Sequence, residues 1–185
     1  MYGARRRQLL TIEHLMAAFQ RLPGVAKTQV GYIAGKTDSP TYEQVCSGST
    51  GHTEAVEVQF DPSGISYREL VQIFFEVHDP TTLNRQGNDR GTQYRSGIYT
   101  HSDEQAKIAA EEKANTQEAL GKPVVTEILT ADRFYPAESC MRPLPVAPAQ
   151  HCGSARRCCQ RAPAAAPPSP LPPVLTGHVS SLLPY

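Results

Sequence analysis

The amino-acid composition changes abruptly at about residue 138, and this change limits how much of the chain can fold. Residues 139–185 hold 10 of the 16 prolines and four of the five cysteines, together with four arginines and no acidic residue. A proline-rich segment without apolar periodicity is typical of disordered chain, because it cannot bury enough apolar surface to form a core. The sequence therefore predicts one folded region before this point and a disordered C-terminal tail after it.

Helical and strand patterns alternate in the region before the tail. Serines at 66 and 102, each followed three residues later by Glu or Gln, mark the starts of two helices. We read Lys36–Thr53, which is rich in glycine and hydroxyl residues, as a loop. The predicted helices cover 12–21, 66–77 and 102–119, and the predicted strands lie near 29–34, 54–60, 96–100 and 124–129. This mixture predicts an α+β fold in which a mixed β-sheet is flanked by helices, an α/β sandwich.

Charge and hydropathy exclude several classes of protein. The formal net charge is zero, which argues against a general nucleic-acid binder. No stretch approaches the roughly 18 consecutive apolar residues of a membrane span, and no signal-peptide pattern follows the start. We therefore expect a cytoplasmic chain with reduced thiols, although the basic run Arg5–Arg7 leaves organelle targeting open.

Three long motifs occur in a fixed order along the chain. They are PTYEQVCSG at 40–48, GHTEAV at 51–56 and HDPTTLNRQGNDRGTQYRS at 78–96. Three shorter motifs, LPGV at 22–25, VGYIAG at 30–35 and FYPAE at 134–138, accompany them. Together they resemble the peptide methionine sulfoxide reductase A family. The resemblance implies a ferredoxin-like core in 19–138, between a divergent segment 1–18 and the Pro/Ala-rich tail 139–185.

The resemblance also implies a reaction. Members of this family reduce the S epimer of methionine sulfoxide, protein-bound or free, to methionine, and so repair oxidative damage. A cysteine thiolate attacks the sulfur, an acid protonates the departing oxygen, and a second thiol resolves the oxidised cysteine. Thioredoxin usually regenerates the enzyme. The resemblance thus implies an external thiol reductant and no metal or organic cofactor. From the charge and hydropathy we expect no nucleic-acid or membrane partner, and we expect a monomer.

Four residues of the matched motifs take functional roles by this resemblance. Glu54 corresponds to the proton donor, and Tyr42 and Tyr94 to the hydroxyl donors that hold the sulfoxide oxygen. Asp89 would orient the substrate, through its backbone amide or a water. Taken alone, each fits a plainer role: a solvated strand end, two packing tyrosines and a turn former. Within the matched motifs the functional roles are favoured.

Other reactive side chains of the same motifs receive structural roles. We expect His52 and His78 to support the fold and take no part in the chemistry. Cys46 is expected to be a buried apolar residue and not a nucleophile, because nothing near it in sequence supplies a cation that would lower its pKa.

The family pattern fails at the start of the domain. Its signature is a Gly-Cys-Phe-Trp-Gly stretch whose cysteine begins the first helix, where the helix dipole favours a thiolate. Counting back from the LPGV motif places this cysteine at about Thr11. The chain contains no tryptophan, and residues 1–10 replace the strand that leads into this helix. Because a threonine hydroxyl is a far weaker nucleophile toward sulfur, we expect no reductase activity.

The pattern fails again after Glu138. The tail cysteines, at 140, 152, 158 and 159, could serve as resolving thiols, or three of them with His151 as a zinc site. The proline run could bind an SH3- or WW-like module. A disordered tail with incidental cysteines is the favoured interpretation.

Three function hypotheses follow from these matches and departures. The first is a methionine-S-sulfoxide reductase, by family. The second is a catalytically inactive domain that still binds methionine sulfoxide peptides or thioredoxin. The third is the product of a misread gene, because a clean match is interrupted at both ends.

Overall fold

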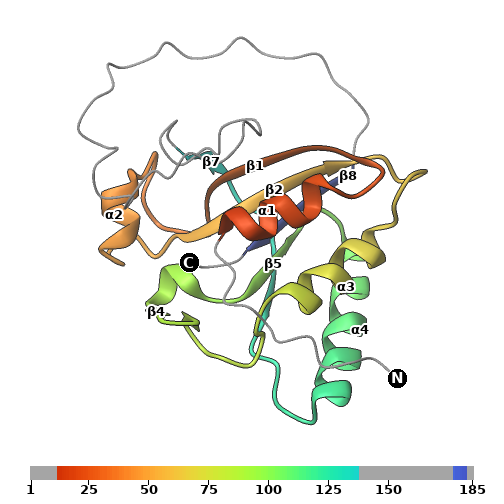
Figure 1. The fold of residues 1–185 in the computed structure, drawn as a ribbon. Coiled ribbons are helices and arrows are strands. Elements are labelled where there is room, and N and C mark those ends of the chain that lie inside the picture. Colours follow the sequence, from red (N-terminus) through yellow and green to blue (C-terminus); the bar gives the residue numbers. More distant parts are fainter. Residues whose placement is uncertain (1–11, 138–176, 183–185) are drawn as a thin grey trace, which may run out of the picture.

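The computed structural model describes residues 12–137 and 177–182 of the chain (Figure 1). Its helices are α1 (Ile12–Gln20), α2 (Tyr42–Cys46), α3 (Tyr67–Val77), the 3-10 helix η1 (Thr92–Tyr94) and α4 (Asp103–Leu120). Its strands are β1 (Val25–Ile33), β2 (Thr53–Phe60), β3 (Arg85–Gln86), β4 (Asp89–Arg90), β5 (Gly97–Thr100), β6 (Glu127–Thr130), β7 (Tyr135–Pro136) and β8 (Gly177–Leu182). The predicted mixture of helices and strands is confirmed.

Six strands form one mixed sheet in the order β6-β5-β8-β2-β1-β7. The pair β5–β6 is parallel and every other neighbouring pair is antiparallel. The hairpin between β1 and β2 is the longest ladder, with Tyr32 opposite Glu54 and Val30 opposite Val56. β3 and β4 form a separate two-stranded ribbon.

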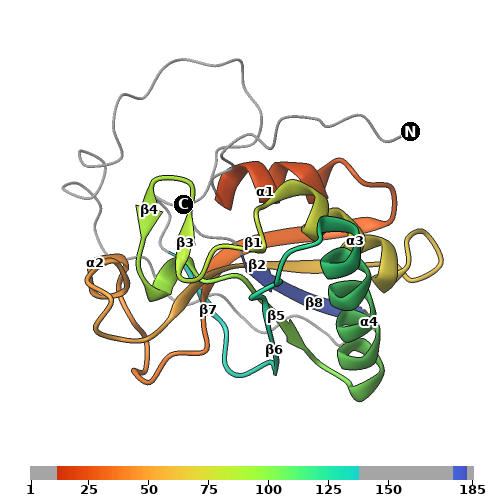
Figure 2. The ribbon, with the colours of Figure 1, turned by 90° about the horizontal axis from the view of Figure 1, so that it is seen from below.

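The three long helices α1, α3 and α4 pack on one face of this sheet (Figure 2). Phe19 of α1 and Phe74 of α3 join Val30, Val56 and other apolar side chains in one core cluster. A smaller cluster lies on the other face of the sheet, where Ile33, Ala55 and Tyr99 pack against Phe134 and neighbouring residues. The predicted sandwich of sheet and helices is therefore confirmed.

The helix boundaries follow from local capping signals. At α3 the Ser66 side chain accepts from the Glu69 backbone, and the Glu69 carboxylate accepts from Ser66 N at 2.9 Å. At α4 the Ser102 hydroxyl accepts from Gln105 N. Gly121 ends α4 in the left-handed conformation, with φ of 59°. These three signals were readable in the sequence.

Two local predictions need correction. The segment read as a loop, Lys36–Thr53, contains α2, which begins at a capping box formed by Thr41 and Gln44. The strand predicted near 124–129 begins only at Glu127, because Val125 N donates to the Pro80 carbonyl at 2.8 Å and so joins the loop.

The structure can be compared with the two predicted boundaries, at residues 18 and 138. Ile12 and Leu15 of α1 are fully buried in the core, so the divergent segment contributes to the domain from residue 12 on. Residues 1–11, including Thr11 and Arg5–Arg7, lie outside the described part of the chain. So do 138–176 and 183–185, which include the tail cysteines. Within the predicted tail, residues 177–182 form β8, a strand that the sequence does not predict.

Candidate active site

Segments that are far apart in the sequence meet at one end of the sheet. Tyr42 is the first residue of α2, Glu54 the second of β2, and Tyr94 the last of η1. In both views α2, β4 and the N-terminal end of α1 lie at this end of the molecule (Figures 1 and 2). The N-terminal end of α1 therefore lies at the same end of the molecule as the elements that carry the three candidate residues.

Glu54 is the buried acid of this group, with none of its surface exposed. Burial raises the pKa of both Tyr42 and Tyr94, and Glu54 adds a smaller upward contribution to each. A phenol is already protonated at neutral pH, and these shifts favour that form further, so both hydroxyls are available as hydrogen-bond donors. The structure thus brings together one acid and two neutral donors, while their catalytic roles stay a prediction.

Cys46 lies in the same group of side chains, and the prediction of a buried apolar residue is wrong. It is a half-buried cysteine at the end of α2 and forms no disulfide bond with another described residue. Its side chain forms a hydrogen bond with the Tyr42 hydroxyl, which further raises the pKa of that phenol. Tyr42 lies four residues earlier on the same helix, so one turn of α2 brings the two side chains together.

Asp89 lies near this group but at its exposed margin. It begins β4, in the ribbon that precedes η1, and its side chain is exposed. Its charge contributes to the raised pKa of Tyr94, after burial and the larger effects of Glu54 and Cys46. The predicted role of Asp89 in substrate orientation stays a prediction.

Two residues beside Tyr94 hold the segments together, and the sequence analysis assigned them no role. Thr53 Oγ1 donates to the Gln93 carbonyl at 2.9 Å, and Gln93 Nε2 donates to the Cys46 carbonyl at 3.2 Å. The Arg95 guanidinium donates to the carbonyls of Gly51 and Ala34 at 3.2 and 3.3 Å, and to Glu127 at 2.7 Å. The sequence offered one indication of their importance: both lie directly beside Tyr94, in the motif GTQYRS.

Gly91 gives the loop before Tyr94 its shape. Its φ of 148° lies in a region that residues with a side chain rarely adopt. A Cβ atom here would lie 2.3 Å from Gln93 Oε1, so the Gln93 side chain occupies the space that any larger residue would need.

The two histidines of the motifs are buried, in agreement with structural roles. The His52 ring packs edge-on against Tyr135 with centroids 5.6 Å apart and fills the space beside Gly35. Burial, and after it the charge of Arg95, lowers the pKa of His52. His78 ends α3, and its ring bonds to the Phe74 carbonyl and to Ser96 Oγ.

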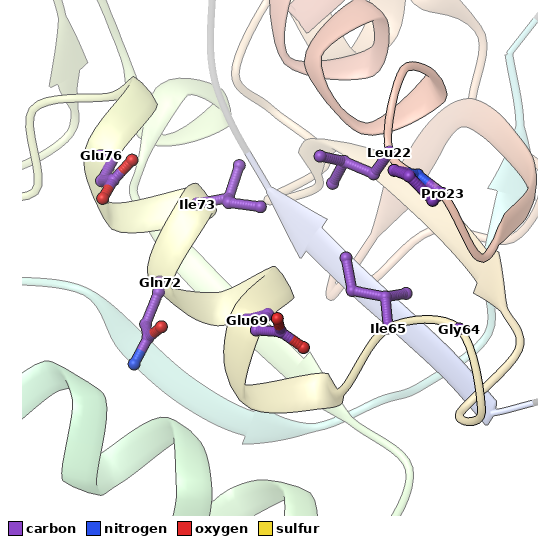
Figure 3. A pocket seen from close by; sticks show the side chains of 8 residues that line it. All are labelled: Leu22, Pro23, Gly64, Ile65, Glu69, Gln72, Ile73 and Glu76. Atoms are coloured by element: carbon purple, nitrogen blue, oxygen red, sulfur yellow. The ribbon is translucent and has the colours of Figure 1, made fainter.

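Two pockets of the described residues are not lined by Tyr42 or Tyr94. One, of about 340 Å³, lies between the turn after α1 and helix α3, with Leu22, Ile65 and Ile73 as its apolar wall (Figure 3). Another, of about 260 Å³, adjoins His52 and Tyr135. Among the described residues, no group of three or more His, Cys, Asp or Glu side chains could hold a metal ion. No helix in this part of the chain is long and apolar enough to cross a membrane.

Comparison with known proteins identifies the family. A sequence model of the family described as "Peptide methionine sulfoxide reductase" matches residues 14–143, which include Tyr42, Glu54, Asp89 and Tyr94. The chain belongs to the peptide methionine sulfoxide reductase family. The resemblance seen in the motifs is thereby confirmed.

Individual members show how much of the family the chain covers. A peptide methionine sulfoxide reductase from Brassica napus is 57% identical over 122 residues, which are 66% of this chain and 48% of that protein. The peptide methionine sulfoxide reductase MsrA of Sulfolobus acidocaldarius is also 57% identical over 122 residues, which are 66% of this chain and 69% of that protein. The chain thus spans about half the length of the Brassica napus and Lactuca sativa relatives.

Solved structures confirm the fold. Mxr1 from Saccharomyces cerevisiae, in reduced form, aligns with a TM-score of 0.64 and 40% identity over 69% of this chain and 73% of that protein. Methionine sulfoxide reductase A of Corynebacterium diphtheriae aligns with a TM-score of 0.61 and 44% identity over 66% of this chain and 64% of that protein.

Proposed function

We propose that this chain carries the methionine sulfoxide binding site of the peptide methionine sulfoxide reductase family and binds the S-sulfoxide without reducing it. One observation carries the proposal: the fold brings fully buried Glu54 within electrostatic interaction range of both Tyr42 and Tyr94. A sulfoxide oxygen is a strong acceptor, and an acid with two neutral hydroxyl donors is a matching set of partners.

The complete reaction of an active family member defines the roles that Glu54, Tyr42 and Tyr94 would have. Reduction of one sulfoxide converts two thiols to a disulfide and releases the oxygen as water. Glu54 would supply a proton to the oxygen as the sulfur–oxygen bond breaks. Removing a carboxyl group from water favours its protonated form, which suits this role. Tyr42 and Tyr94 would hold the oxygen as it gains negative charge.

Turnover also needs a thiolate next to the sulfoxide sulfur. The sequence has threonine at the expected position, and Cys46 is the only cysteine in 12–137. Loss of a covalent nucleophile commonly removes roughly 10⁴-fold or more of the rate in well-studied hydrolases. Binding does not need the nucleophile, so the oxygen site can remain functional without it.

The substrate and partners follow from the family. The ligand would be methionine-S-sulfoxide, in proteins or free, and the external reductant of an active member would be a thiol such as thioredoxin. No cofactor is required by this chemistry. We propose a monomeric, cytoplasmic protein, while one relative is a chloroplastic reductase from Arabidopsis thaliana, so organelle targeting stays open.

Binding can be tested without turnover. The purified chain would be titrated with N-acetyl-methionine-S-sulfoxide amide, followed by NMR, with the R epimer and the methionine analogue as matched ligands. We expect the S-sulfoxide to bind at least about tenfold more tightly than the methionine analogue, because each hydrogen bond to the oxygen contributes about 1 kcal/mol. Tyr94→Phe removes one of these bonds and should weaken S-sulfoxide binding about fivefold, while methionine binding stays unchanged.

The control variant removes a tyrosine hydroxyl outside the proposed oxygen site. Tyr135→Phe removes a phenol that packs edge-on against His52 and bonds to Asp38 at 2.8 Å. This variant should bind the S-sulfoxide like the original chain. Equal affinity for sulfoxide and methionine analogues in the original chain would contradict the proposal.

A further inference from the structure

The tail strand β8 occupies an internal position in the sheet. It pairs antiparallel with β2, where Val58 lies opposite Val179, and antiparallel with β5, where Ile98 lies opposite Ser181. β2 and β5 have no direct ladder with each other, since β8 separates them in the strand order. This one strand therefore joins the β2-β1-β7 part of the sheet to the β5-β6 part.

The two flanking strands need such a partner. All four residues of β5 are buried, and β2 is buried at six of its eight positions. Buried main-chain N–H and C=O groups left without partners are costly, and an open strand edge attracts another strand. Without β8, the facing edges of β2 and β5 would form an empty strand position in the middle of the sheet.

The same strand bridges the two segments that carry the site. Ser181 lies opposite Val56, two residues beyond Glu54 on β2. Leu182 lies opposite Gly97, three residues beyond Tyr94. The end of β8 thus sets the spacing between the strand of the acid and the segment of the second tyrosine.

The residues of β8 have a low propensity for strand structure, so they contribute little to keeping it in the sheet. GHVSSL begins with glycine, which is depleted in strands, and Val179 is its one β-branched residue. The strand is therefore held mainly by main-chain pairing with its two neighbours.

We propose that the position between β2 and β5 is a binding site for an extended peptide strand, and that residues 177–182 are its exchangeable resident. Recognition is by main-chain hydrogen bonds to both neighbours, so the site accepts a free peptide that adds antiparallel to each. A tethered strand has an effective concentration on the order of millimolar, so a free copy of the same strand displaces half of it at about that concentration. The proposal does not depend on the sulfoxide site.

The test uses the full chain and hydrogen–deuterium exchange read by mass spectrometry. Ser180→Pro removes one main-chain donor from the middle of β8 and prevents regular pairing. Ser169→Pro is the matched control, because it makes the same substitution in the tail outside β8. We expect amides of Thr53–Phe60 and Gly97–Thr100 to exchange at least about tenfold faster in Ser180→Pro. The control should exchange like the original chain, and α4 reports on the rest of the domain.

A free peptide, VLTGHVSSLLP, corresponding to residues 174–184, completes the test. Added at millimolar concentration, it should restore slow exchange in β2 and β5 of Ser180→Pro, while a peptide with the same proline should not. Should Ser180→Pro expose α4 as well, recovery on adding the peptide still supports the site, and failure to recover overturns it. Equal exchange in β2 and β5 for Ser180→Pro, Ser169→Pro and the original chain also overturns the proposal.

Discussion

Buried hydrogen bonds join His78, Ser96 and Thr126, and Ser96 lies two residues after Tyr94. Their contribution to the free energy of unfolding can be predicted and measured. His78 Nδ1 lies 2.6 Å from the Phe74 carbonyl, and its Nε2 lies 2.8 Å from Ser96 Oγ, which in turn lies 2.8 Å from Thr126 Oγ1. A carbonyl only accepts, so Nδ1 carries a hydrogen, and Nε2 of the neutral ring then accepts from Ser96. The Ser96 oxygen in turn accepts from Thr126.

Replacement of Ser96 by alanine removes two of these bonds together. His78, Ser96 and Thr126 are only 2%, 4% and 0% exposed, so water does not take over the lost bonds. Each buried partner that loses a hydrogen bond costs about 1–3 kcal/mol. We therefore expect Ser96→Ala to lower the free energy of unfolding by about 2–4 kcal/mol. Thr126→Val keeps the shape, breaks one bond and should cost about half as much.

Urea unfolding followed by far-UV circular dichroism measures these differences. Ser49→Ala is the matched control, because Ser49 is exposed and bonds only within its own loop, and its effect should stay within about 0.5 kcal/mol. A Ser96→Ala variant as stable as this control would refute the reasoning. So would a Thr126→Val variant that costs more than Ser96→Ala.

Two further predictions concern the site loop and the buried histidine. Gly91→Ala should destabilise the chain by about 1–3 kcal/mol in thermal unfolding, because its φ of 148° strains any residue with a Cβ and Gln93 fills the space; an unchanged melting temperature would contradict this. Burial lowers the pKa of His52, so the unfolded chain takes up a proton more readily, and the free energy of unfolding should fall as pH drops below about 6.5. His52→Gln should flatten this dependence relative to the exposed control His14→Gln, and an identical pH profile in both variants would speak against it.

The sequence predicts the main helices and strands because their signals are local. The capping box at Ser66, the serine cap at residue 102 and the glycine after Leu120 act within one turn, and each helix begins or ends as they indicate. The alternation of Val56, Val58 and Phe60 likewise places β2. α2 was missed, because a five-residue helix has too few apolar positions to show a period, although Thr41 and Gln44 mark its start.

The strand β8 could not be predicted from its own residues. Its six residues carry a glycine and two serines, and their place in the sheet depends on the edges of β2 and β5, far away in sequence. Strand pairing of this kind reflects tertiary context more than propensity.

The candidate site was predictable only through the family motifs. Nothing local distinguishes Tyr42 or Tyr94 from ordinary packing tyrosines, and their proximity to Glu54 depends on the whole fold. The supporting residues Gln93 and Arg95 were missed because the bonds by which they join α2 and the ends of β1 and β2 run to main-chain carbonyls more than 40 residues away, at Cys46, Gly51 and Ala34. The half-burial of Cys46 was missed, because the exposure of a cysteine near a helix end depends on what packs against it.

The central claim is that the chain retains an oxygen-binding site without the nucleophile that reduction needs. The measurement that tests it most directly is the rate of methionine-S-sulfoxide reduction by the purified chain, with dithiothreitol or thioredoxin as reductant. Cys46→Ser and a chain with a restored Gly-Cys-Phe-Trp-Gly segment would be assayed beside it. We predict no turnover above background for the original chain and for Cys46→Ser. Robust turnover by the original chain would contradict the claim, and its loss in Cys46→Ser would identify Cys46 as the nucleophile.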